Sequence, residues 1–234
     1  MILYIVRHGD PDYSTDSLTE RGVKQAEALG KRFAKTGIDT VYSSPMGRAR
    51  QTAEPTCRLL GLPMNIEEWA HEVLHERLTT YPYGEKRSVS LIPNTYMREK
   101  GEIDIPFDRT FESKVLRESE AESAFNYIRD NGREFLARLG YVEEDGIYRI
   151  TRNNEEKVAL FCHTVFARFW LSYLLHLPLH LMWGGFKLTH TGVVALEFKN
   201  NENGITAPTC LTFSDMSHLY CEGLDTIHDN SIEI

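Results

Sequence analysis

The sequence predicts an α/β protein with three layers, α/β/α, built on a mainly parallel sheet with an antiparallel edge. Short apolar runs alternate along the chain with longer runs that have a helical spacing. The runs 2–6 and 157–162 are too short for helices and have the composition of buried strands. Near the end, 193–198 and 205–213 flank a turn at 200–204, which predicts a hairpin at the edge of the sheet.

The first amphipathic run predicts a helix over 19–36. Thr19 is suited to cap this helix and Gly37 to end it. We expect its inward face to contain Val23, Ala26, Leu29, Gly30 and Phe33.

A second helix should cover 45–60, after a short strand at 40–42. Ser44 is a natural N-cap, and Pro45 fits the first helical turn. The residues at 64–66 are then predicted to form a third strand.

The stretch 67–117 has no sustained periodicity and is punctuated by three prolines. An irregular stretch of this length inside a compact domain is often functional, and we expect it to cap the carboxyl ends of the strands. The whole chain 1–234 then forms one domain with a cap-like insertion. Six side chains of the insertion are either substrate contacts or solvated loop residues, namely Tyr81, Tyr83, Lys86, Arg87, Tyr96 and Arg98.

The second half of the chain should contain two more helices. The run 119–139 is amphipathic, with inward residues Phe125, Ile128, Phe135, Leu136 and Leu139. The run 165–176 is apolar on nearly all sides, which predicts a buried helix. A minor strand is expected at 146–150.

Composition narrows the classes of function. The 234-residue chain has a formal net charge of −8, which argues against a general binder of nucleic acid or of acidic membranes. No uncharged apolar run reaches the length of about eighteen residues that a membrane span needs, and the apolar start is too short for a signal peptide. Four cysteines lack a metal-binding spacing, so we expect reduced thiols and a cytoplasmic protein. The oligomeric state is left open.

The ends of three predicted strands carry a cluster of cationic and imidazole side chains. Arg7, His8 and Gly9 follow the first strand, Arg48 lies early in the helix after the second, and His163 follows the strand 157–162. Ligands bind at the carboxyl ends of strands in open α/β sheets. Two arginines can hold the oxygens of a phosphoryl group, His163 can add a third donor, and His8 can attack phosphorus if its other ring nitrogen is held by a carbonyl.

Several motifs in this order resemble the histidine phosphatase superfamily, also called phosphoglycerate mutase-like. The matching pieces are Arg7-His8-Gly9, Leu18-Thr19-Glu20-Arg21-Gly22, the run from Ser44-Pro45 through Arg48-Ala49 to Gln51-Thr52-Ala53, His163, and Asp215-Met216-Ser217-His218-Leu219. The resemblance covers roughly 1–66 and 155–222.

The resemblance implies a phosphoglycerate mutase-like fold and a phosphohistidine intermediate on His8. It implies a catalytic set of Arg7, His8, Arg48, His163 and a glutamate. We expect Thr164 to be a further substrate contact and the substrate to be a small phosphorylated molecule. No metal or cofactor is expected, because the arginines supply the positive charge. Mutases of the family usually follow the triplet with Ser or Thr and then Trp-Asn. Here Asp10-Pro11-Asp12-Tyr13 follows, so we favour a phosphatase over a mutase.

A leaving alkoxide needs a proton, and three glutamates could supply it. The family takes this residue from the segment after the third strand, where Glu72 is the better match and Glu76 a rival. Glu122 is a third candidate, although Ser119 and Glu122 also have the spacing of a capping box.

Two other classes of function remain open. His71, Glu72 and His75 satisfy the H-E-x-x-H pattern of zinc peptidases, with Glu99 or Glu102 as a third ligand. The polar run that follows does not form the long buried helix that such a site uses. A binding protein without activity would be expected to lack His8 or an arginine, and this chain keeps both.

Overall fold

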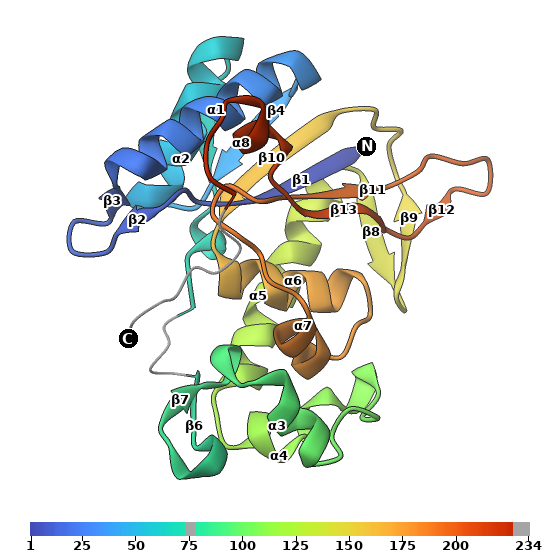
Figure 1. Cartoon of the computed structure of the whole chain (residues 1–234). Coiled ribbons are helices and arrows are strands. Elements are labelled where there is room, and N and C mark those ends of the chain that lie inside the picture. Colours follow the sequence, from blue (N-terminus) through green and yellow to red (C-terminus); the bar gives the residue numbers. More distant parts are fainter. Residues whose placement is uncertain (74–77, 227–234) are drawn as a thin grey trace.

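A six-stranded sheet forms the centre of the molecule (Figure 1). The computed structural model describes residues 1–73 and 78–226. In spatial order, the strands are β13 (Thr209–Asp215), β11 (Val193–Glu197), β1 (Ile2–Arg7), β10 (Lys157–Cys162), β4 (Thr40–Ser43) and β5 (Met64–Ile66). The last four are parallel, and β11 and β13 pair antiparallel. This confirms the predicted sheet with its antiparallel edge.

Helices cover both faces of the sheet, which confirms the three layers. In Figure 1, α1 (Glu20–Thr36) and α2 (Gly47–Leu60) lie above the sheet, and α5 (Ala121–Arg138) and α6 (Thr164–Leu174) lie below it. Alternate residues of a strand point to opposite faces. Accordingly, Val6 joins the apolar core under α1 and α2, whereas Leu3 and Ile5 join the core on the other side.

Helix α1 begins and ends as predicted, but its buried face differs by one position. The hydroxyl of Thr19 accepts a hydrogen bond from the amide of Gly22, and Gly37 adopts the left-handed conformation. Val23, expected inward, is 48% exposed, whereas Gln25 is buried. The reason is a polar contact: the side-chain oxygen of Gln25 accepts a hydrogen bond from the amide of Asp10 at 2.8 Å, which turns this edge of the helix toward the loop after β1.

Helix α2 begins at Gly47, two residues later than predicted, and Ser44 is not its N-cap. The hydroxyl of Ser44 instead contacts the imidazole of His163. The residue before the helix, Met46, provides no side-chain cap. The carboxylate of Asp16 caps the helix instead, because it accepts a hydrogen bond from the amide of Gly47 at 2.7 Å.

The irregular stretch 67–117 contains only short elements. They are η1 (Glu68–Ala70), β6 (Thr79–Thr80), η3 (Pro82–Gly84), β7 (Arg87–Ser88), η4 (Val89–Leu91), α3 (Asn94–Glu99), η5 (Phe107–Glu112) and α4 (Lys114–Arg117). Most of them lie below α6 and α7 (Leu179–Gly185) in Figure 1. Buried Arg168 of α6 ties this part together by donating to the carbonyls of Trp183 and Ser90. That it acts as a cap within a single domain stays a prediction.

The remaining predictions for the second half hold, with corrections at the start of one helix and within one strand. All five residues expected inward on the helix at 119–139 are buried, although α5 starts at Ala121 with Glu120 as its N-cap, so the capping box is not formed. The buried helix is α6, and the minor strand is β9 (Ile147–Ile150). The expected strand 205–213 is split into β12 (Ile205–Thr206) and β13, because Pro208 between them has no amide to donate.

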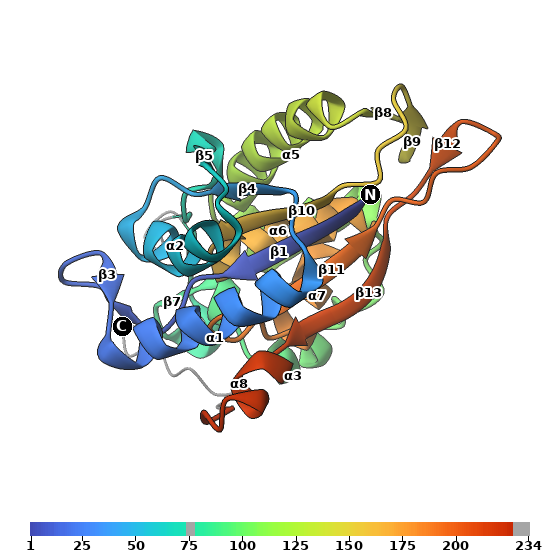
Figure 2. The ribbon, with the colours of Figure 1, turned by 90° about the horizontal axis from the view of Figure 1, so that it is seen from above.

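Elements that the sequence did not predict are short. Strands β12, β9 and β8 (Tyr141–Glu144) form a small sheet at the end of the molecule where the chain begins (Figure 2). Further unpredicted elements are α7, β2 (Pro11–Asp12), β3 (Ser17–Leu18) and α8 (Ser217–Cys221). In the described ranges 1–73 and 78–226, the helices are all too short or too polar to span a membrane.

Candidate active site

The parallel pairing of β1 and β10 brings the two predicted histidines side by side. Arg7 is in register with Cys162, so the residues that follow, His8 and His163, leave the sheet together. The amide of His8 donates to the carbonyl of Cys162 at 2.9 Å, and the two imidazole centroids are 5.2 Å apart. Both rings are essentially inaccessible to solvent.

His8 has one ring nitrogen engaged and one available. Its Nδ1 donates to the carbonyl oxygen of Gly9 at 2.7 Å, which leaves the lone pair on Nε2. Burial, together with the charges of His163, Arg7 and Arg48, holds the pKa of His8 well below its usual value. A neutral imidazole with a free Nε2 is the form that can act as a nucleophile.

Arg7 offers unused donors in the same buried space. One terminal nitrogen of its guanidinium donates to the carbonyl of Leu188 at 2.8 Å. Nε and the other terminal nitrogen are buried, and no hydrogen bond of at most 3.5 Å reaches them from residues 1–73 or 78–226. Burial lowers the pKa of Arg7, and the nearby Tyr13 and Glu72 act in the opposite direction. These two nitrogens form the edge that can hold two oxygens of an anion.

Arg48 reaches the site from the start of α2. One terminal nitrogen donates to the carboxylate of Asp16 and the other to the thioether of Met46 at 3.6 Å. The guanidinium carbon lies 5.4 Å from the centre of the Tyr13 ring. Arg50, two residues later, is exposed, as expected for a surface position.

His163 is held by the loop that precedes α2. Its Nε2 is 2.8 Å from the hydroxyl of Ser44, and its Nδ1 has no hydrogen-bond partner in the described part of the chain. Burial, with the charges of Arg48 and Arg7, keeps the pKa of His163 well below its ordinary value. Thr164 is the first residue of α6 and is also buried.

Close backbone packing explains two of the glycines in the sequence motifs. A Cβ on Gly9 would lie 2.9 Å from the carbonyl oxygen of Gly22, and a Cβ on Gly22 would lie 2.2 Å from that of Asp10. The amide of Gly9 also donates to the hydroxyl of Thr52 at 2.9 Å. The loop after β1 is therefore clamped between the first turn of α1 and the body of α2, which positions His8.

Glu72 lies at the N-terminus of α6, beside His163. Its two carboxylate oxygens accept hydrogen bonds from the amides of Val165 at 3.2 Å and Phe166 at 2.9 Å. The amide of Glu72 donates to the thioether of Met46 at 3.4 Å. The same sulfur accepts from Arg48. Of its two rivals, Glu76 lies outside the described residues, and Glu122 is exposed at the start of α5.

The H-E-x-x-H pattern does not form a helix over its described part. The short helix η1 ends at Ala70, and His71 has an extended backbone with φ −65° and ψ 159°. The second histidine of the pattern, His75, lies outside the described residues. Glu99 accepts a hydrogen bond from Tyr83, and Glu102 accepts from Ser113. In the ranges 1–73 and 78–226, no three His, Cys, Asp or Glu side chains are grouped as metal ligands.

Three residues of the site had no signal in the sequence. Tyr13 and Asp16 lie on a loop and contact Arg48, and His190 lies after α7 with its ring centroid 5.7 Å from that of His8. The Nδ1 of His190 is 3.3 Å from the carboxylate of Asp10, but burial, with Arg7 and Arg21, lowers the pKa of His190 to about 2. No local motif surrounds these residues, because their places depend on contacts between distant segments.

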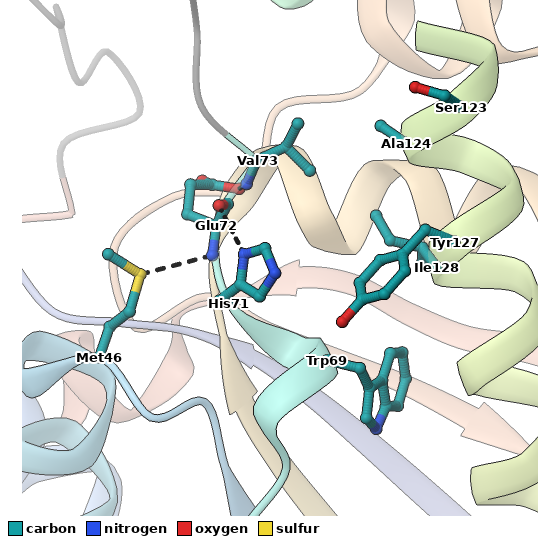
Figure 3. Close-up of a pocket in the computed structure, with 9 residues that line it drawn as sticks. All are labelled: Met46, Trp69, His71, Glu72, Val73, Ser123, Ala124, Tyr127 and Ile128. Carbon is teal, nitrogen blue, oxygen red and sulfur yellow. Dashed lines mark hydrogen bonds between the residues drawn. The ribbon is translucent and has the colours of Figure 1, made fainter. Parts of the chain in front are cut away.

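A cavity of about 620 Å³ adjoins this cluster (Figure 3). It lies between the segment 69–73 and α5, and Met46 and Glu72 form its border with the cluster. Its lining residues are Met46, Trp69, His71, Glu72, Val73, Ser123, Ala124, Tyr127 and Ile128. The six side chains of the insertion that were considered as substrate contacts are not among them.

Comparison with known proteins supports the resemblance seen in the motifs. Residues 3–102 match the family model of the histidine phosphatase superfamily, branch 1. A protein of Hydrogenobacter thermophilus named "Putative phosphoserine phosphatase 2" is 34% identical over 80 residues, which are 30% of this chain and 39% of that protein. A protein of Erwinia tasmaniensis named "Probable phosphoglycerate mutase GpmB" is 28% identical over 59% of this chain and 69% of its own length. The chain thus covers about two fifths of the first of these relatives and just over two thirds of the second.

Solved structures share the fold over nearly the whole chain. The phosphoserine phosphatase of Entamoeba histolytica in complex with 3-phosphoglyceric acid superposes with a TM-score of 0.60, at 19% identity, over 93% of this chain and 98% of that structure. A mycobacterial glucosyl-3-phosphoglycerate phosphatase superposes with a TM-score of 0.58, at 19% identity, over 91% and 98%. These similarities establish the fold, which is the fold expected from the sequence.

Proposed function

We propose that the chain, whose residues 3–102 match the model of the histidine phosphatase superfamily, is a phosphomonoesterase that acts on a small phosphorylated metabolite through a phosphohistidine on His8. The observation that carries this proposal is the state of His8. Its Nδ1 is occupied by the carbonyl of Gly9, its Nε2 makes no hydrogen bond to the residues that the structure describes, and its pKa is lowered by burial so that the ring is neutral. Buried arginines stand beside this nucleophile.

In the first step, Nε2 of His8 attacks phosphorus, and the bond from phosphorus to the ester oxygen breaks. Nε and one terminal nitrogen of Arg7, which have no partner in the described part of the chain, stabilise the negative charge on the phosphoryl oxygens, with Arg48, His163 and Thr164 as further donors. Such donors are effective because they are fixed before the reaction and shielded from water.

The departing oxygen needs a proton, and we assign its transfer to Glu72. This carboxyl group lies at the border between the cationic cluster and the neighbouring cavity. In the second step, Glu72 takes a proton from water, the water oxygen attacks phosphorus, and the bond between phosphorus and His8 breaks to release phosphate. Microscopic reversibility makes the same residue acid and then base.

A mutase is the second candidate, because curated relatives carry that name. The two activities differ in whether water or a substrate hydroxyl takes the phosphoryl group from His8. The residues after the triplet, 10–13, lack the Trp-Asn pair of the family's mutases, and we therefore favour hydrolysis. With 3-phosphoglycerate as substrate, free phosphate should appear faster than isomerised phosphoglycerate.

Three further properties are part of the proposal. The reaction needs no metal, since the arginines supply the positive charge. The protein acts in the cytoplasm, which is consistent with thiols at all four cysteines, and its partner is a small molecule rather than a nucleic acid. The chain is one domain, and its insertion at about 67–117 caps the site.

Trapping the covalent intermediate tests the central claim. Wild-type protein is mixed with labelled p-nitrophenyl phosphate in the presence of a chelator and quenched within milliseconds. We expect label on His8 that is stable to alkali and lost in acid. His8→Ala should show neither label nor hydrolysis, a loss of at least about a thousandfold. Activity that is lost with the chelator and restored by zinc would favour the metallopeptidase-like site instead.

A further inference from the structure

The lining of the cavity beside the phosphoryl site is mainly apolar and aromatic. Trp69, Val73, Ala124 and Ile128 are buried residues whose side chains line it. The rings of His71 and Tyr127 lie next to each other, with centroids 5.9 Å apart (Figure 3). Its volume, about 620 Å³, is in the range of pockets that enclose a small organic molecule.

The charge of the lining is unusual for a site next to a phosphate-binding cluster. Glu72 is the one Asp, Glu, Lys or Arg among the nine described lining residues, and it is acidic. Arg48 is not among the described lining residues, and it contacts the cavity only through the thioether of Met46. A carboxylate placed in this space would meet the acidic side chain of Glu72 and no arginine or lysine among the described lining residues.

The cavity also has the position that an esterified group requires. Met46 contacts both Arg48 and the backbone of Glu72, so the cavity begins where the cationic cluster ends. If Arg7 and Arg48 hold the phosphate, its ester oxygen would therefore lie next to Glu72. The rest of the substrate would then extend into the cavity toward Tyr127 and Trp69.

We propose that this cavity binds the alcohol part of the substrate, and that this part is uncharged and apolar, with an aromatic ring as the best fit. The inference rests on the proposed phosphatase activity and adds a substrate class to it. It separates this chain from enzymes that act on substrates such as phosphoserine or 3-phosphoglycerate, in which the leaving group carries a carboxylate.

Three primary alkyl esters test the preference with leaving groups of similar reactivity: 2-phenylethyl phosphate, ethyl phosphate and 3-phosphoglycerate. We expect kcat/KM for the phenylethyl ester to exceed that for ethyl phosphate by about tenfold or more, because a phenyl group is removed from water. The value for 3-phosphoglycerate should be the lowest of the three. An equal or higher value for 3-phosphoglycerate overturns the inference.

Variants of α5 test whether the cavity is responsible. Tyr127 is 46% exposed, so Tyr127→Ala should fold, raise KM for the phenylethyl ester several-fold and change ethyl phosphate hydrolysis less than twofold. Tyr220→Ala removes an 82% exposed tyrosine from another part of the surface and should change neither. Equal effects of Tyr127→Ala on the two esters would contradict the assignment.

A charge placed in the cavity should reverse the selectivity. Ser123→Arg adds a guanidinium at an exposed position of the lining and should raise kcat/KM for 3-phosphoglycerate about fivefold, the size expected of a partly screened charge pair. Ser123→Gln has a similar reach without the charge and should give no such gain. An equal gain in kcat/KM for Ser123→Gln would show that the charge of the new side chain is not the cause.

Binding to His8→Ala separates failure of this inference from failure of the proposed function. If no ester is hydrolysed by the wild type, the phosphatase proposal is wrong. Calorimetry on His8→Ala then still reports whether the phenylethyl ester binds more tightly than 3-phosphoglycerate, as the cavity predicts. Hydrolysis without any such preference in binding or in kcat/KM overturns the inference alone.

Discussion

Buried, unused donors define the chemistry at the scale of single residues. A guanidinium nitrogen that is removed from water and left without an acceptor costs free energy, and no acceptor in residues 1–73 or 78–226 is within hydrogen-bond distance of two buried nitrogens of Arg7. Nδ1 of His163 is likewise buried and has no hydrogen-bond partner among the described residues. A phosphoryl group in this space would supply the missing acceptors. Folding therefore places these groups in position before the substrate binds. Enzymes stabilise charge in a transition state with donors that are preorganised in this way.

Arg48→Ala should reduce activity far more than Arg50→Ala. Arg48 is buried next to Tyr13 and Asp16 at the start of α2, whereas Arg50 on the same helix is exposed. Losing a charged donor to a phosphoryl transition state should cost several kcal/mol, or roughly a hundredfold or more in kcat. Steady-state kinetics with p-nitrophenyl phosphate measures both variants. Similar, small losses would mean that Arg48 does not contact the transferred group.

Glu72→Gln should impair substrates according to how well their oxygen leaves. An alkyl alkoxide needs a proton, whereas nitrophenolate leaves well without one. We expect phosphorylation of His8 by an alkyl phosphate to slow by roughly a hundredfold or more, and phosphorylation by nitrophenyl phosphate to slow much less. Single-turnover rates measure this step directly. If Glu76→Gln shows the leaving-group dependence and Glu72→Gln does not, the donor is Glu76.

Site residues that lie at the end of a predicted strand could be identified from the sequence. Site residues that reach the site through contacts between distant segments could not. Arg7, His8 and His163 follow buried strands, and parallel pairing brings such strand ends together. Asp16 and His190 reach the same site from loops that no periodicity describes. Ser44 was predicted as a helix cap because its sequence neighbours allow that role. Its observed partner is 119 residues away, and local sequence contains no trace of it.

Among the elements, the crossing of α1 and α2 depends on a glycine at the contact. A Cβ on Gly30 of α1 would lie 2.8 Å from Cβ of Pro55 and 3.0 Å from its carbonyl carbon, both in α2. This close contact holds the two helices on one face of the sheet, and α2 in turn positions Arg48. The sequence suggested Gly30 as part of the buried face, but the requirement for a hydrogen at that position follows only from the helix crossing.

Gly30→Ala should destabilise the protein by about 1–3 kcal/mol, because the added methyl group must push α1 and α2 apart. In an unhindered helix the same substitution stabilises by about 0.5–1 kcal/mol. Gly185→Ala, at the end of α7, is the matched control, since a Cβ there meets nothing within 4 Å. Urea unfolding gives both values. An increase in stability for Gly30→Ala would show that the helix pair has room to spare.

At the scale of the whole molecule, several neutral histidines are enclosed together near the carboxyl end of the sheet. His8, His163, His190 and His218 are all buried, and burial is the largest cause that lowers the pKa of each. Each of them is then neutral in the folded protein at pH values where the unfolded chain binds a proton. The folded state should therefore lose stability as the pH falls below about 6.5, the usual pKa of histidine.

His218 allows this acid sensitivity to be measured apart from the catalytic residues. It lies in α8 with Nε2 3.0 Å from the hydroxyl of Thr191, and burial, with the charge of Arg32, lowers its pKa to about 4 against the opposing effect of Asp215. Between pH 6.5 and 4, the unfolded chain binds a proton at this position and the folded protein does not, so stability rises with pH across that window. From pH 7 to pH 5, the free energy of unfolding of the wild type should fall by about 2 kcal/mol more than that of His218→Gln.

Urea unfolding at the two pH values measures this difference, with His176→Gln as the control because His176 is exposed. The amide of Gln can keep a hydrogen bond to Thr191, so the variant should fold at pH 7. If His218→Gln and the wild type lose the same stability between pH 7 and pH 5, His218 binds its proton equally well in both states. The acid sensitivity of the molecule would then have to come from the histidines around His8, where neutrality at low pH is also what a nucleophilic imidazole requires.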